Sequence, residues 1–189
     1  GRVRAWRAAH GARSYPGSPL LALSALRDID TAVCVESQAP VSRALQRAID
    51  QASPAASCRV ENADGYRALR AHLPPASRRG LVLIDPPYED AAEERHIAAA
   101  LAEGLARFAT GVFAVWYPIK RRHDSDLWVA RVARGITRPT VAAEFCLNPP
   151  DHAAGLNGSG MLIVNPPWQF DVDASAWQQA LESLLDARG

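Results

Sequence analysis

The segment RRGLVLIDPPYED, residues 78–90, decides both the fold and the chemistry that this sequence predicts. Leu81 to Ile84 form a short apolar run, which is typical of a strand buried on both faces of a parallel sheet. Asp85 follows at once. The two prolines after it donate no backbone hydrogen bonds and hold the chain extended, so they end the strand. The segment therefore predicts a buried strand whose carboxyl end carries an acidic residue.

Strands and helices alternate outward from this segment. We expect strands at 31–35, 58–61, 81–84, 112–116, 140–147 and 161–164, and helices at 15–26, 40–51, 91–108 and 124–134. Ser18 is the expected N-cap of the first of these helices, with Pro19 at its first position. This alternation indicates an α/β fold with a mostly parallel sheet, covered on both faces, and a C-terminal antiparallel hairpin. A length of 189 residues fits a single domain over 1–189.

The composition is that of a globular protein, with 48% apolar and 22% charged residues. No apolar run approaches the roughly 18 residues that cross a bilayer, and the first residues lack the apolar core of a signal peptide, so a cytoplasmic protein is expected. The net charge of +1 gives no overall basic field, so any nucleic-acid contact requires a local patch. Cysteines and histidines are scattered without metal-ligand spacing and are expected to be reduced, solvated or structural: Cys34, Cys58, Cys146, His10, His72, His96 and His152.

Acidic residues follow three successive predicted strands, at Glu36, Asp64 and Asp85. In parallel α/β sheets, ligands bind at the carboxyl ends of the strands. A carboxylate at such a position can accept hydrogen bonds from ribose hydroxyls or from an adenine amine, so the three together predict a pocket for an adenosine-bearing cofactor. The alternative is that these strands simply end in polar residues.

The segment Asp85, Pro86, Pro87 and Tyr88 is suited to reaction at an exocyclic aromatic amine, whose lone pair is delocalised into the ring. The Asp85 carboxylate and the Pro86 carbonyl can hold the two amine hydrogens and direct the lone pair toward an electrophilic methyl group. Asp85 can also take the released proton. Tyr88 can stack on the base, a contact worth about 1–3 kcal/mol. The alternative is a strand end followed by a proline turn.

The pattern Asp/Asn-Pro-Pro-aromatic is typical of amino-group methyltransferases with a Rossmann-like fold. Together with YPGSPLLA at 15–22, ADGY at 63–66, GVFAVWYP at 111–118 and SGMLIVNPPW at 159–168, it makes the chain resemble the ribosomal RNA large subunit methyltransferase J family. The resemblance covers nearly the whole chain, with the segments in the family's order.

The resemblance implies a class I methyltransferase that uses S-adenosyl-L-methionine to methylate the N6 amine of one adenine in bacterial large-subunit (23S) ribosomal RNA. Asp85 would be the acid–base residue, within the catalytic set Asp85, Pro86, Pro87 and Tyr88. The cofactor would contact Ser18, Glu36, Asp64, Gly65 and Asp85, with its ribose at Glu36 and its adenine at Asp64. A monomer that works without a metal is expected.

The sequence departs from this family at its beginning. Family members carry upstream a first strand with a Gly-rich turn, a basic His-containing segment and a small helical insertion, whereas this sequence begins at Gly1. We therefore expect an N-terminal truncation. The missing strand would lie between those that end at Glu36 and Asp85, so this piece alone is expected to be inactive.

Two further groups of residues have a functional and a structural interpretation. Asn165 begins a second Asn-Pro-Pro-aromatic segment, which is expected only to end the hairpin if its strand is the last of the sheet. Lys120, Arg121 and Arg122 follow a predicted strand and could contact RNA phosphates, or could be solvated surface charge. Core packing and a role in the base pocket are both open for Trp116 and Tyr117.

Three other functions compete with this one. A DNA adenine-N6 methyltransferase would keep the chemistry but usually adds a sequence-reading domain. A non-catalytic RNA-binding remnant would be expected to lose the carboxylate of Asp85. Protein glutamine methyltransferases carry Asn rather than Asp at the start of the Pro-Pro motif. The sequence favours the RNA enzyme.

Overall fold

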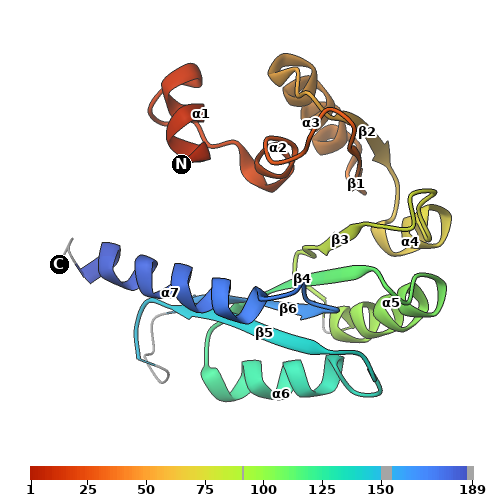
Figure 1. Ribbon diagram of the computed structural model, residues 1–189, viewed down its shortest axis with the longest axis vertical. Coiled ribbons are helices and arrows are strands. Elements are labelled where there is room, and N and C mark those ends of the chain that lie inside the picture. Colours follow the sequence, from red (N-terminus) through yellow and green to blue (C-terminus); the bar gives the residue numbers. More distant parts are fainter. Residues whose placement is uncertain (91, 150–154, 187–189) are drawn as a thin grey trace. The chain divides into compact units, whose positions relative to one another are not determined.

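The computed structural model describes residues 1–90, 92–149 and 155–186 (Figure 1). Ala91, the expected first residue of one helix, and His152 lie outside these ranges. The helices are α1 Arg2–His10, α2 Gly17–Leu23, α3 Ala39–Ala52, α4 Gly65–His72, α5 Glu93–Arg107, α6 Arg122–Val132 and α7 Phe170–Asp186. The strands are β1 Thr31–Glu36, β2 Ser57–Asn62, β3 Leu81–Ile84, β4 Val112–Ile119, β5 Thr140–Cys146 and β6 Gly158–Val164.

The chain divides into two compact units, Gly1–Ala71 and His72–Gly189. In the first unit, β1 and β2 form a two-stranded parallel sheet, paired from Thr31 with Ser57 to Glu36 with Asn62. Its core is built around Leu20, Leu23 and Ile49 from α2 and α3. These elements bring the ends of β1 and β2 to the same sheet edge.

In the second unit, four strands form a sheet in the order β3-β4-β6-β5. β3 runs parallel to β4, whereas β6 lies between β4 and β5 and is antiparallel to both. Figure 1 shows α6 on one side of this sheet and α7 on the other. The carboxyl ends of β3 and β4 therefore lie at one edge, and the carboxyl end of β6 lies at the opposite edge.

The core of the second unit packs most closely where β4 meets α5. Phe113 is fully buried, as are Ile97 and Leu101 of α5. A Cβ at Gly104 would lie 2.6 Å from Cε1 of Phe113, so this helical position has room for glycine alone. The missing side chain lets α5 approach β4 and cover the strand that leads to the candidate site.

The structure confirms the predicted α/β class and the C-terminal antiparallel hairpin. All six expected strands are present, with ends that differ by a few residues. The predicted N-cap is wrong, because α2 begins at Gly17 with Pro16 as its cap residue, and Ser18 lies inside the first turn. Gly17 has a φ of 66°, a left-handed conformation that glycine adopts without strain and that turns the chain into the helix.

Three helices have no counterpart among the predicted elements: α1, α4 and α7. The three cysteines are free thiols. No helix in the described part of the chain is long and apolar enough to cross a membrane.

The predicted single domain stays a prediction, because no described strand joins the β1–β2 sheet to the β3–β4–β6–β5 sheet. β1 and β3 are both edge strands, and both expose apolar side chains: Val33 on β1 is 41% exposed, and Leu81 and Leu83 on β3 are 64% and 44% exposed. The strand that the sequence analysis expects between them stays a prediction.

Candidate active site

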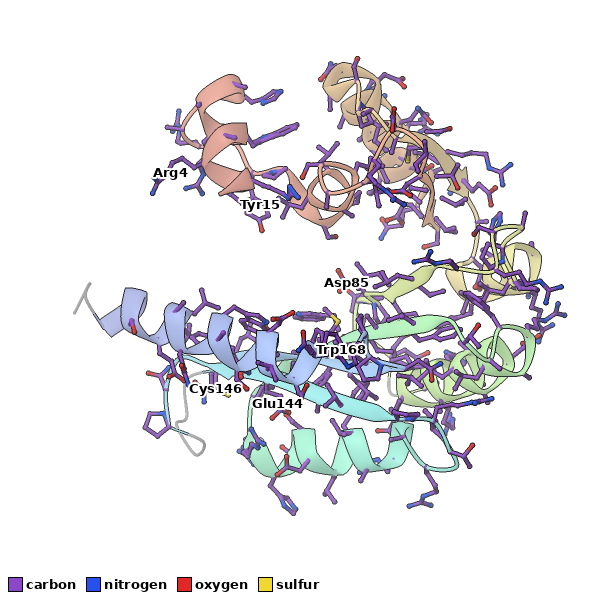
Figure 2. The ribbon with its side chains drawn as sticks, viewed as in Figure 1. Arg4, Tyr15, Asp85, Glu144, Cys146 and Trp168 are labelled. Atoms are coloured by element: carbon purple, nitrogen blue, oxygen red, sulfur yellow. The ribbon has the colours of Figure 1, made fainter. Side chains whose placement is uncertain are left out.

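The register of β3 and β4 determines where Asp85 lies. Ile84 pairs with Val115, so Asp85 follows at the same level as Trp116, at the edge where both parallel strands end. Asp85 is exposed there, yet partial burial raises the pKa of its carboxyl group above the ordinary value. Figure 2 labels Asp85 at the end of its strand. The position suits a carboxylate that acts on a bound ligand.

Tyr88 is held in place by two tryptophans. Its ring packs edge-on against Trp116, with centroids 5.8 Å apart, and against Trp128 of α6 at 6.1 Å. Its hydroxyl donates a hydrogen bond to the Trp116 carbonyl. Burial raises the pKa of Tyr88, so the phenol stays neutral and remains a donor.

The backbone of Tyr88 is strained. Its φ of 55° lies in the left-handed region, which a non-glycine side chain occupies at a cost of about 1–3 kcal/mol. Strain of this kind persists where the surroundings fix the conformation, and here the Trp116 carbonyl and the two indole rings do so. The Asp-Pro-Pro-Tyr segment is thus a rigid element rather than a free loop.

A polar network that includes the buried Tyr117 packs against Trp128. Tyr117 is 1% exposed and stacks on Trp128 with centroids 4.7 Å apart. Its hydroxyl donates to Oε1 of Glu144 at 2.6 Å, and Nη1 of Arg122 lies 2.5 Å from Oε2 of the same carboxylate. A Cβ at residue 160 would overlap the Tyr117 ring, which explains the glycine there. The network connects β4, β5 and α6, and through Trp128 it contacts the aromatic residues around Tyr88.

This network answers two questions that the sequence left open. Tyr117 is a core residue, whereas Trp116 lies beside Tyr88 at the site edge. Arg122 is engaged by Glu144 and also by Asp126 at 3.1 Å, so its guanidinium has a structural role, and its contact with RNA stays a prediction. Lys120 and Arg121 are exposed, and their contact with RNA stays a prediction. Sequence reasoning missed Trp128 and Glu144; a lone carboxylate within the apolar strand TVAAEFC was the available signal for the latter.

The second Pro-Pro segment lies elsewhere. Its strand β6 is inside the sheet rather than last in it, which corrects the sequence-based strand order. Because β6 is antiparallel to β4, Asn165 lies beyond the Val164–Phe113 pair, at the edge opposite Asp85. Its Nδ2 donates to the carbonyls of Ala109 and Gly111 at 3.0 and 2.8 Å. Asn165 therefore anchors the turn that enters β4.

In the first unit, Glu36 is the last residue of β1 and Asp64 follows the end of β2, beside it at the same sheet edge. The Glu36 carboxylate accepts a hydrogen bond from the Gln38 amide at 2.8 Å, and the Asn62 side chain ties down the Glu36 carbonyl at 2.8 Å. Asp64 caps α4, because its Oδ1 accepts from the amides of residues 66 and 67 at 2.8 and 3.1 Å. Both carboxylates thus have a structural role in addition to any cofactor contact.

Gly65 leaves room at this edge. A Cβ added at Gly65 would meet no atom within 4 Å, so the backbone there is open to a ligand within its own unit. Ser18 is exposed in the first turn of α2. Among the residues that the structure describes, no group of three or more His, Cys, Asp or Glu side chains could hold a metal ion.

Comparison with known proteins identifies relatives over most of the chain. The family model described as "Ribosomal RNA large subunit methyltransferase D, RlmJ" matches residues 2–188. The ribosomal RNA large subunit methyltransferase J of Escherichia coli K12 is 40% identical over 159 residues, and that of Haemophilus influenzae Rd is 37% identical over 163. Each match covers 84% of this chain and 56% of the relative, so the chain spans about half the length of these proteins.

Solved structures agree on the fold. A Legionella pneumophila protein superposes with a TM-score of 0.77 and 31% identity, over 88% of this chain and 61% of its own. A putative methyltransferase of Streptococcus mutans, solved with S-adenosylhomocysteine, superposes with a TM-score of 0.52 and 12% identity, over 79% of this chain and 83% of its own. The second likeness concerns the fold alone.

The buried network predicts a difference between two carboxylates that share one arginine. Glu144→Ala leaves the Tyr117 hydroxyl and Arg122 without their buried acceptor, which should lower the free energy of unfolding of the full-length protein by about 1–3 kcal/mol. Asp126→Ala removes the exposed partner of the same arginine and should change it by less than about 1 kcal/mol. Urea denaturation measures both values. Equal losses would show that Glu144 has no special structural role.

Proposed function

The chain belongs to the ribosomal RNA large subunit methyltransferase J family, and we propose that the full-length protein methylates the N6 amine of an adenine in 23S ribosomal RNA. The observation that carries the proposal is the Asp-Pro-Pro-Tyr segment, placed by the β3–β4 register at the carboxyl edge of a methyltransferase sheet. Because bacterial ribosomal RNA is cytoplasmic, the enzyme would act in the cytoplasm.

Different site residues would bind the amine, accept its proton and position the base. The Asp85 carboxylate and the Pro86 carbonyl accept the two amine hydrogens, which turns the nitrogen lone pair out of the ring system. Asp85 then takes the proton that the nitrogen loses as its new bond to carbon forms. Tyr88 presents its ring to the base while Trp116 and Trp128 hold it. Fixed geometry of this kind lowers the barrier by orienting the reacting atoms beforehand.

S-adenosyl-L-methionine would supply the electrophilic methyl group carried on its sulfonium. The residues of the first unit fit its adenosine part: Glu36 offers a carboxylate for the ribose hydroxyls, Asp64 one for the adenine amine, and Gly65 an open backbone. Ser18 would add a contact from the same unit. Lys120 and Arg121 would meet RNA phosphates near the edge where β4 ends.

The cofactor assignment predicts a selective loss of affinity. Glu36→Ala removes a charged acceptor from two ribose hydroxyls, which should cost about 1.5–3 kcal/mol of S-adenosyl-L-methionine binding, a loss of more than tenfold. Asp50→Ala, which removes an exposed carboxylate from α3 of the same unit, should leave the affinity unchanged. Isothermal titration calorimetry on the full-length variants measures both. An unaltered affinity in Glu36→Ala would restrict Glu36 to its structural role.

The catalytic assignment predicts opposite effects for the two Pro-Pro segments. Asp85→Ala in the full-length enzyme should abolish transfer of a tritiated methyl group to unmodified large-subunit RNA, while cofactor binding largely survives. Asn165→Ala should keep the transfer activity and lower stability by about 1–3 kcal/mol, because two backbone carbonyls lose their donor. An active Asp85→Ala beside a folded, inactive Asn165→Ala would overturn the assignment.

A further inference from the structure

The positive charge of this chain is concentrated at its beginning. Residues 1–15, which we term the arginine segment, hold four arginines and no Asp or Glu; the first acidic residue is Asp28. Residues 1–71 contain ten basic and six acidic residues, whereas residues 72–189 contain eleven and fourteen. The net charge of the first unit, +4, thus equals that of the arginine segment. A chain with a net charge of only +1 thus contains a strongly basic segment.

The four arginines, Arg2, Arg4, Arg7 and Arg13, are all exposed. Nη1 of Arg2 donates to the Ser24 carbonyl at 3.2 Å, and Nε of Arg7 to the Ser14 carbonyl at 3.3 Å. Within the described residues, no carboxylate forms an ion pair with any of the four. Arginines elsewhere do have such partners, as in the Arg131–Glu94 pair at 2.7 Å. The charge of the arginine segment is therefore not neutralised inside the described structure.

Part of this charge is unfavourable for the local structure. Arg4 and Arg7 are three residues apart on α1, where like charges lie side by side and repel. The helix is attached through Trp6, which packs on the cluster of Leu20, Leu23 and Ile49 and stacks on His10 at a centroid distance of 3.7 Å. The apolar contact holds α1, and the side chains of Arg4 and Arg13 make no hydrogen bond or ion pair within the described residues. An external polyanion would relieve their repulsion.

An exposed aromatic side chain completes the surface. Tyr15, at the end of the arginine segment, is 63% exposed. Figure 2 shows the Arg4 side chain extending outward from α1, and Tyr15 on the connection that leaves this helix. Guanidinium groups bind phosphates, and an exposed phenol ring stacks on unpaired bases. The combination is the chemistry of contact with single-stranded RNA.

We propose that the arginine segment is an RNA-binding surface of the enzyme, which contacts substrate phosphates through Arg4, Arg7 and Arg13 and an unpaired base through Tyr15. The inference rests on the proposed function, since it names the surface that holds the same substrate. It also adds to the Lys120–Arg122 cluster, in which Arg122 is already engaged by Glu144.

The test compares two double variants of the full-length protein: Arg4→Gln/Arg7→Gln on α1, and Arg43→Gln/Arg47→Gln on α3. The second pair removes the same charge from exposed positions of the same unit. Fluorescence anisotropy with a labelled transcript of unmodified large-subunit RNA, over a range of salt concentrations, gives affinity and salt dependence. The α1 variant should bind about tenfold more weakly, and its salt slope should fall by about 1.4–1.8 for two lost phosphate contacts.

Two further measurements make the outcome decisive. Tyr15→Ala should weaken RNA binding without altering the salt slope, because stacking releases no counterions. Cofactor affinity should stay unchanged in every variant. Equal RNA affinity of the two double variants overturns the inference, even if both bind RNA much more weakly than the wild type. A wild-type protein that binds the transcript but methylates no RNA contradicts the proposed function alone, and the anisotropy comparison still decides on the surface.

Discussion

The parallel pairing of β3 with β4 is the constraint on which the candidate site depends. This pairing, Leu81 with Val112 through Ile84 with Val115, brings Asp85 and Trp116 to one sheet edge. The Trp116 carbonyl then accepts a hydrogen bond from the Tyr88 hydroxyl. This contact fixes the end of the Pro-Pro turn that follows Asp85. A shift of one residue in this register would turn Asp85 to the other face and separate Tyr88 from its acceptor. Close packing of Phe113 against Gly104 holds β4 against α5.

Strand direction separates two segments that look alike in sequence. Asp-Pro-Pro-Tyr and Asn-Pro-Pro-Trp both follow apolar strands, yet β6 is antiparallel to β4 and carries Asn165 to the opposite edge. There its side chain amide holds two backbone carbonyls. Asp85 differs from Asn165 in this respect, because its carboxylate is exposed and anchors no turn among the described residues, while partial burial raises its pKa. The Asp85 carboxylate is therefore available for chemistry, whereas the Asn165 amide is engaged by the backbone.

The sequence predicted the strands well because most of them are short apolar runs bounded by polar or proline residues, as in LVLI before Asp85. It missed α1, whose arginines give no apolar periodicity, and it missed α7, although Trp177, Leu181 and Leu184 recur there at helical spacing. The place of the last strand in the sheet stayed a condition because a hairpin can pair with β4 through either strand, and only tertiary packing decides. The contact of Tyr117 with Glu144 joins residues 27 positions apart and leaves no local pattern.

The identity of the methylated nucleoside tests the account most directly. Full-length protein is incubated with S-adenosyl-L-methionine and unmodified 23S ribosomal RNA, the RNA is digested, and its nucleosides are separated and identified by mass spectrometry against standards. An Asp-Pro-Pro-Tyr segment that holds an exocyclic amine predicts N6-methyladenosine as the new product, absent when Asp85 is alanine. Methylation at a ribose hydroxyl or a base carbon, or a product that persists without the Asp85 carboxylate, would contradict the account.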